Sequence, residues 1–122
     1  YRYIKKKETD MIDSYTFGEI VIDGQPYTND VIIYPDHVDG SWWRKSGHNL
    51  VPDDIRDVLQ DSPDTLIVGT GASGVMKVPE DTKGVVREKG IELIVERTHQ
   101  AVEEYNRRKD QENAVAALHL TC

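Results

Sequence analysis

Apolar and polar positions alternate early in the chain and predict a pair of β-strands. Ile20 and Ile22 fall on one face of an extended segment, with polar or opposite-facing residues between them. Asp23-Gly24 follows as a turn signal, since glycine tolerates the positive φ that tight hairpin turns need. The pattern predicts a β-hairpin, ended by Pro35, with strands over residues 17–23 and 27–34.

Further along, apolar residues at helical spacing alternate with short runs that are apolar throughout. Ile55, Val58 and Leu59 recur at i, i+3 and i+4, as on the buried stripe of a helix. The short runs are bounded by turn residues, which is typical of buried strands. This reasoning predicts helices over residues 52–61, 79–89 and 98–109, with Thr98 as an N-cap, and strands over residues 65–68, 91–95 and 114–120.

The order of these elements determines the expected fold class. Strands that alternate with helices favour a largely parallel sheet with helices packed on its faces, and an initial hairpin makes the sheet mixed. We therefore expect an α/β fold: a single three-layer domain with a mixed central sheet begun by a β-hairpin and helices on both faces. Residues 1–13 lack a clean period and are expected to form a tail, and residues 14–122 the domain.

Composition narrows the class of protein further. The 122 residues suffice for one domain, and 38% hydrophobic with 30% charged residues is a globular balance. A net charge of −7 disfavours binding to nucleic acid. The lysine-rich start lacks the apolar core of a signal peptide, and no segment is long and apolar enough to span a membrane. With Cys122 as the single cysteine, these features predict a cytoplasmic protein without an internal disulfide.

A glycine-rich loop follows the first buried strand. Gly69, Gly71 and Gly74 are spaced as G-x-G-x-x-G, the pattern of a dinucleotide-binding βαβ unit. In that unit the helix starts within the loop, whereas residues 75–78 precede the predicted helix here, so no nucleotide or other cofactor is expected. Two interpretations remain open. The loop is a tight turn that needs positive φ, or it is a nest of backbone amides, Ser73 included, that binds a small anion.

The segment 36–50, expected to be a structured loop or a short strand, contains an unusual cluster of Trp42, Trp43, Arg44 and His48. Two successive tryptophans on an extended segment face opposite ways, so one is expected in the core and its neighbour on the surface. The cluster is either a packed corner capped by arginine or a binding surface for a protein or ligand, since Trp and Arg often dominate binding energy.

The end of the sequence places His119 and Cys122 close together. A metal site needs three or four ligands, and no other histidine has a paired spacing with these two, so no metal is expected. A nucleophilic cysteine beside a histidine would still lack the third group of a triad. On an extended segment the two side chains point to opposite sides, and Cys122 is expected to anchor the terminus as a small apolar group.

Several motifs in the same order resemble the adipogenesis-associated Mth-domain family, small proteins of unknown function whose fold a mitochondrial complex I assembly factor shares. The resemblance implies a three-layer α/β fold with a mixed central sheet over residues 17–122, and suggests a protein-binding role by analogy. It assigns no catalytic residue. Its motifs are residues 27–32, Trp42-Trp43-Arg44 with Gly47-His48, residues 68–74 with Lys77-Val78-Pro79, Ala101-Val102 with Tyr105-Asn106, and residues 116–122.

Two hypotheses for function follow. The first is a non-enzymatic binding or assembly module that contacts a protein partner through Trp42 and Trp43, because no complete catalytic set is present. The alternative is a small anionic-ligand-binding protein, or an enzyme, that uses residues 69–74 with Arg44 and His48. Monomer and homodimer are both compatible with the sequence. Redox use of the Cys122 thiol is a third idea, which requires an exposed thiol of low pKa.

Overall fold

A five-stranded mixed sheet forms the centre of the protein in the computed structural model, which describes residues 11–122. Its strand order is β5-β4-β8-β6-β7. β6 pairs in parallel with both β7 and β8, whereas β4 pairs antiparallel with β8 and β5. The predicted mixed sheet is confirmed, and its strands are β4 (Val31–Ile33), β5 (Val38–Asp39), β6 (Thr65–Thr70), β7 (Glu92–Glu96) and β8 (Ala114–His119).

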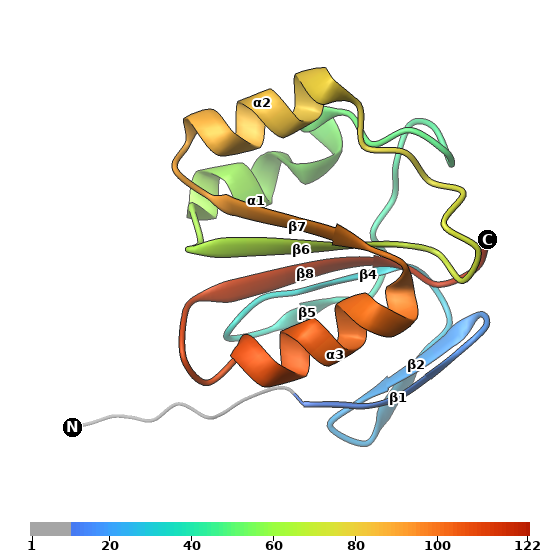
Figure 1. Ribbon diagram of the computed structural model, residues 1–122. Helices are drawn as coiled ribbons and strands as arrows, with labels where there is room; N and C mark the ends of the chain where they lie inside the picture. The colour runs from blue at the N-terminus through green and yellow to red at the C-terminus, as the bar shows by residue number, and fades with distance from the viewer. Residues whose placement is uncertain (1–10) are drawn as a thin grey trace.

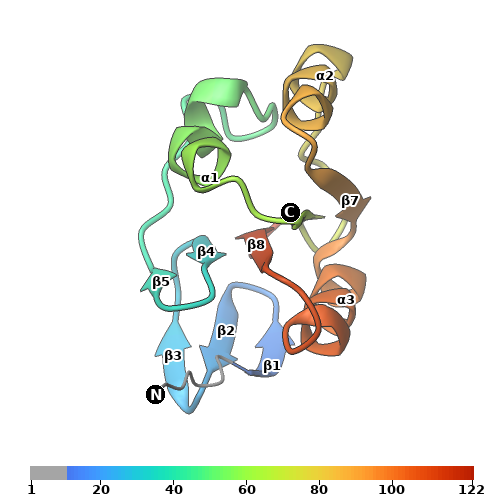
Figure 2. The ribbon, with the colours of Figure 1, turned by 90° about the vertical axis from the view of Figure 1, so that its left-hand side faces the viewer.

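Helices cover both faces of this sheet, as predicted (Figure 1). One face carries a 3-10 turn, η1 (Pro52–Ile55), followed by α1 (Arg56–Asp61) and α2 (Glu80–Glu88). The other face carries α3 (Thr98–Arg108), and Figure 2 shows the three layers end on. Every residue of β6 and β8 is buried, because alternate side chains of these central strands enter the two opposite cores.

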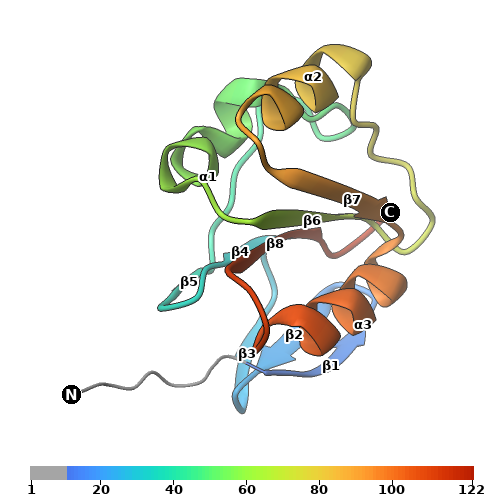
Figure 3. The ribbon, with the colours of Figure 1, turned by 60° about the vertical axis from the view of Figure 1, so that its left-hand side comes forward.

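A second, three-stranded antiparallel sheet lies beside α3 on the lower face of the central sheet (Figure 3). Its strands are β1 (Ile12–Thr16), β2 (Glu19–Ile22) and β3 (Gln25–Tyr27). Ile12, Ile20 and Ile22 are buried in the same core as residues of α3 and the central sheet. Because β1 begins at Ile12, the last two residues of the predicted tail belong to a strand, and residues 1–10 lie outside the described part of the chain.

The hairpin prediction was right about the turn and wrong about the sheet. β2 and β3 pair around Asp23-Gly24, both with positive φ. The predicted strand over residues 27–34 is instead two strands in different sheets, since β3 ends at Tyr27 and β4 begins at Val31. Polar residues 28–30 interrupt the apolar pattern and let the chain cross between the sheets. The mixed sheet is therefore begun by β4 and not by the hairpin.

The three predicted helices are present, with one local difference. Thr98 is the first residue of α3, and Arg97 occupies the N-cap position without a side-chain cap. The Thr98 hydroxyl is buried and donates to the His119 carbonyl instead. None of the helices within residues 11–122 has the length and apolar character of a membrane-spanning segment.

Candidate functional site

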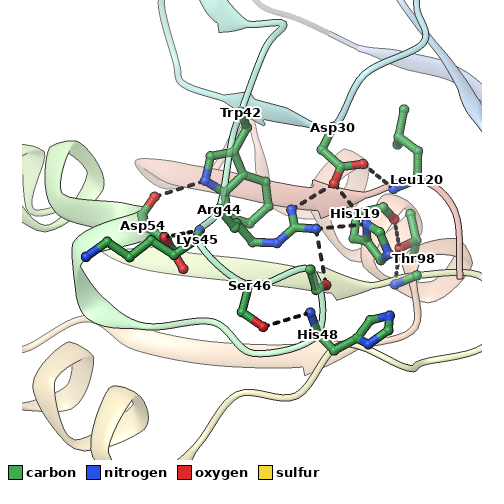
Figure 4. Close-up of polar contacts among 12 residues, drawn as sticks. Asp30, Trp42, Arg44, Lys45, Ser46, His48, Asp54, Thr98, His119 and Leu120 are labelled. Atoms are coloured by element: carbon green, nitrogen blue, oxygen red, sulfur yellow. Dashed lines mark hydrogen bonds and ion pairs between the residues drawn. The ribbon is translucent and has the colours of Figure 1, made fainter.

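Asp30, Arg44 and His119 form a buried polar cluster at the carboxyl end of β8 (Figure 4). Asp30 comes from the crossing between the two sheets, Arg44 from the loop after β5, and His119 from the last residue of β8. The Arg44 side chain is only 6% exposed, Asp30 16% and His119 10%. Charged groups at this depth are stable only when paired, and here each has a partner.

The Asp30 carboxylate is the centre of the cluster. Its Oδ2 lies 2.7 Å from Nη1 of Arg44 and 2.8 Å from Nδ1 of His119, and its Oδ1 accepts the Leu120 backbone amide at 2.8 Å. Burial alone would raise the pKa of Asp30, but the hydrogen bonds from His119, Leu120 and Arg44 outweigh it and lower the pKa below its ordinary value. Asp30 is therefore ionised at neutral pH and holds three segments together.

Arg44 makes several contacts within the chain besides its ion pair with Asp30. Its guanidinium lies 4.7 Å from the centre of the Trp42 ring, within the range of a cation–π contact, and Nη2 donates to the Gly47 carbonyl at 3.4 Å. Its Nε is buried and has no hydrogen-bond partner within the described residues. A guanidinium that is neutralised by Asp30 and covered by protein is not free to bind an external anion.

The His119 ring is oriented by the carboxylate. Nδ1 lies near Oδ2 of Asp30 and also 3.2 Å from Nη2 of Arg44, but a guanidinium only donates and a carboxylate only accepts. The shorter contact favours Nδ1 as the donor to Asp30. In residues 11–122, no hydroxyl or thiol hydrogen-bonds with this ring, so the pair lacks the nucleophile of a catalytic triad.

The glycine-rich loop uses its backbone amides inside the protein. Gly71 donates to the Thr98 hydroxyl at 2.8 Å, Ala72 to the Thr121 carbonyl at 2.7 Å, and Val75 to the Cys122 carbonyl at 3.0 Å. These bonds fasten the loop to the segment that follows β8. The amides of Gly71, Ala72 and Val75 are thus satisfied within the chain and are not free donors for an anion-binding nest.

Packing explains why two of these glycines are needed. Gly71 has a φ of +104°, and a Cβ there would lie 2.3 Å from the carbonyl carbon of Cys122. A Cβ on Gly69 would lie 2.8 Å from the Thr98 hydroxyl. The positive φ of Gly71 and Gly74 supports the tight-turn interpretation, whereas Gly69 lies within β6 and has no positive φ.

Backbone hydrogen bonds bring the segment of His48 close to the residues that follow the glycine-rich loop. Lys77, just beyond the glycines, donates its amide to the His48 carbonyl at 2.8 Å, and Leu50 returns a bond to the Lys77 carbonyl at 2.9 Å. The His48 side chain is exposed, as are Ser73 and the Cys122 thiol. No group of three His, Cys, Asp or Glu side chains able to hold a metal ion occurs in the described part of the chain.

The two tryptophans behave as alternation predicts. Trp42 is 6% exposed and its indole donates to the Asp54 carbonyl at 2.9 Å, whereas Trp43 is 74% exposed. Both line two surface hollows. One, of about 220 Å³, extends toward η1 and α1, and the other, of about 410 Å³, extends toward residues 28–30. We call Trp43 and these two hollows the Trp43 surface.

Sequence reasoning missed Asp30 and Thr98. Asp30 lies 89 residues from His119, and Thr98 lies 27 residues from Gly71. The available signal for Asp30 was the polar interruption of residues 28–30 between two apolar stretches. The local sequence marks Thr98 only as a helix cap, and nothing in it indicates that Thr98 faces the end of β8.

Residues 12–120 match the model of a family described as a protein of unknown function, DUF498/DUF598. Three solved structures have a similar fold. A conserved hypothetical protein of Pyrococcus horikoshii OT3 is 26% identical, with a TM-score of 0.78 over 91% of this chain and 98% of that one. A Bartonella henselae protein described as an outer membrane protein is 23% identical, with a TM-score of 0.79 over 93% and 96%.

The third is a Bordetella pertussis protein described as a Mth938-like domain. It is 18% identical, with a TM-score of 0.64 over 98% of this chain and 92% of that one. These likenesses support the Mth-type fold that the sequence motifs implied. The descriptions of the family and of the Pyrococcus protein name no activity.

Proposed function

The chain belongs to the protein family of unknown function DUF498/DUF598, whose description names no activity. We propose that the chain is a protein-binding module that uses the Trp43 surface. The observation that carries this proposal is the 74% exposure of Trp43. Trp43 lines two hollows, and tryptophan is among the residues that contribute most to binding energy.

The base beneath Trp43 supports the proposal because it is rigid. Trp42, the adjacent residue, is fixed by its bond to the Asp54 carbonyl and by the Arg44 guanidinium over its ring. The Trp42 amide also donates to the Asp30 carbonyl at 3.0 Å. A contact residue on a preformed base loses little entropy when it binds.

The anionic-ligand alternative has less support. It requires free donors on residues 69–74 together with Arg44 and His48. The amides of Gly71, Ala72 and Gly74 bond within the chain, and Arg44 is neutralised by Asp30 at 2.7 Å. Binding of a protein therefore accounts for more of the observed features than binding of a small anion or chemistry on one.

A reducing compartment, with the cytoplasm as our first choice, is part of the same proposal, since the one cysteine is a free thiol. An assembly role, which the resemblance to the adipogenesis-associated Mth-domain family suggests, would be one form of protein binding. Fractionation of source cells would test the compartment, because recovery of the protein in an oxidising compartment contradicts it.

Site-specific photo-cross-linking tests the proposal. A photoreactive residue in place of Ser41, which lines the larger hollow, is expected to give discrete adducts in source extract, and Trp43→Ala is expected to abolish them. The same photoreactive residue at the exposed Glu103 on α3, beneath the opposite face of the central sheet, is the matched control.

Two further variants sharpen the result. Phe17→Ala removes another exposed aromatic side chain, 64% exposed in the turn between β1 and β2, and is expected to leave the Ser41 adducts unchanged. If the adducts are as strong with Trp43→Ala as with the wild-type sequence, the Trp43 surface is not the binding site and the proposal fails.

A further inference from the structure

The smaller hollow of the Trp43 surface combines aromatic walls with carboxylates. Trp43 is the exposed aromatic residue of its lining, Tyr34, Trp42 and Ile55 are buried beneath it, and Asp39 and Asp57 line it as well. We call this region the acidic hollow. Its volume of about 220 Å³ lies below the 300 Å³ or so at which pockets begin to hold drug-sized ligands, so it suits one side chain better than a whole small molecule.

The carboxylates around the acidic hollow are not equivalent. Asp53 is paired with Arg56 at 2.6 Å, and Asp54 accepts the backbone amides of Lys45 and Val51. Asp39 accepts the Ser41 backbone amide at 3.0 Å, but neither Asp39 nor Asp57 forms an ion pair with any residue from 11 to 122. Because four aspartates and one cation, Arg56, line the hollow, it carries net negative charge.

Tyr34 reports the same negative field from inside the hollow. Burial, and then the charges of Asp57, Asp39 and Asp61, raise the pKa of Tyr34 to about 12. Arg56 also senses the charge of Asp57, but its guanidinium bonds to Asp53. A cation that entered the hollow would meet carboxylates that the described residues leave without an ion pair.

We infer that the acidic hollow binds an arginine side chain from a basic segment of a protein partner. The inference rests on the proposed function and names the chemistry of the partner. A guanidinium can stack on the exposed Trp43 ring while its planar fork faces the carboxylates of Asp39 and Asp57. Charge complementarity with this acidic protein, whose net charge is −7, would also steer a basic partner toward it.

Arginine fits this hollow better than lysine or a free metal ion. Lysine is a compact, strongly hydrated charge that neither stacks as a plane nor forks to two carboxylates. A metal ion would make no use of the aromatic walls. The guanidinium of Arg44 already lies over the Trp42 ring, which illustrates the same chemistry inside the protein.

The test follows the 1H–15N NMR spectrum of the full chain during titration with an acetylated, amidated Gly-Arg-Gly-Arg-Gly peptide. The Trp43 indole signal and the amides of Asp39 and Asp57 are expected to shift saturably. The peptide with citrulline in place of arginine keeps the shape but loses the charge, and is expected to bind about tenfold more weakly or not at all.

Variants in which asparagine replaces an aspartate test whether the peptide binds in the acidic hollow. Asp39→Asn and Asp57→Asn alter exposed residues and are each expected to weaken the peptide about two- to fivefold. Glu103→Gln changes the net charge equally on α3 and is expected to have no effect. Equal weakening by all three variants would mean that only the overall charge matters, and would overturn the inference.

Two other outcomes would also overturn it. If a Lys5→Gln/Lys6→Gln/Lys7→Gln variant shifts the Trp43 and Asp57 signals without peptide, the occupant is this chain's own basic segment. If Trp43-dependent cross-links from position 41 form equally with Asp39→Asn and Asp57→Asn, the partner is not held through a basic group. In that second case the protein-binding function stands and only the arginine assignment falls.

Discussion

At the scale of single residues, Asp30 shows how one carboxylate fixes the geometry of a surface several residues away. It neutralises Arg44, orients His119 and accepts the Leu120 amide. Arg44 in turn lies over Trp42, the neighbour of the exposed Trp43. The sequence indicated the opposite facings of Trp42 and Trp43, because alternation is a local property, but it contained no local sign of Asp30's partners.

Removal of Arg44 is expected to destabilise the protein strongly. Arg44→Met leaves the Asp30 carboxylate buried with only two of its donors, and the free energy of unfolding is expected to fall by roughly 3 kcal/mol. Urea denaturation measures this change. Arg56→Met breaks an exposed pair and is the matched control, with no expected change. Equal effects of the two variants would contradict the structural role of Arg44.

The ionisation of Tyr34 is expected to make stability depend on alkaline pH. The pKa is 10.0 for an unperturbed tyrosine and about 12 in the folded protein, so the folded state holds the phenolic proton more tightly. The resulting stabilisation is complete below about pH 10 and is lost as pH rises through about 12. Tyr34→Phe is expected to remove this part of the pH dependence.

Because the chain has six tyrosines, the difference between the tyrosinate titrations of the wild-type sequence and of Tyr34→Phe isolates the same pKa. In Asp57→Asn, the pKa of Tyr34 is expected to fall because the largest of the carboxylate contributions is absent. Glu103→Gln, on α3, serves as the control and is expected to leave it unchanged. An unaltered Tyr34 pKa in Asp57→Asn would contradict the negative field assigned to the acidic hollow.

At the scale of elements, the glycine-rich loop at the end of β6 holds the segment after β8 in place by backbone hydrogen bonds. Its glycines were evident in the sequence, and so was the choice between a turn and an anion nest. What the sequence lacked was the partner, since residues 119–122 are distant along the chain. The predicted strand over residues 27–34 failed for a related reason: local apolarity marks two strands but does not say that they belong to different sheets.

Gly71→Ala tests the close contact between the glycine-rich loop and the segment after β8. The substitution combines a positive φ with a clash against the Cys122 backbone, and is expected to lower the free energy of unfolding by roughly 2–4 kcal/mol. Gly47→Ala, where a Cβ meets nothing within 4 Å, is the control and should change stability little. Thermal unfolding of the two variants compares them, and equal midpoints would show that the close contact is absent.

At the scale of the whole molecule, two sheets and α3 share one core. The Tyr15 hydroxyl donates to the Leu120 carbonyl at 2.7 Å, and the Gly18 amide donates to the same carbonyl at 2.9 Å. The Asn106 side chain of α3 bonds both the amide and the carbonyl of Ile12. A small three-stranded sheet gains stability from packing against a helix, and these bonds set its position.

Asn106→Ala is expected to loosen β1 selectively. The variant leaves the Ile12 amide and carbonyl without their side-chain partner and is expected to cost about 1–2 kcal/mol. Native-state hydrogen exchange should show faster exchange in β1 and little change in β8. Uniform acceleration in both strands would mean that the small sheet has no local opening of its own.

The central position of β8 also has a consequence for biosynthesis. β4 leaves the ribosome early, but its sheet neighbour β8 spans residues 114–119, so most of the domain must be translated before the two can pair. Until then the apolar strands Val31–Ile33 and Thr65–Thr70 lack the strand that joins them. The nascent chain is thus expected to fold late, and to depend on chaperones that shield those strands during translation.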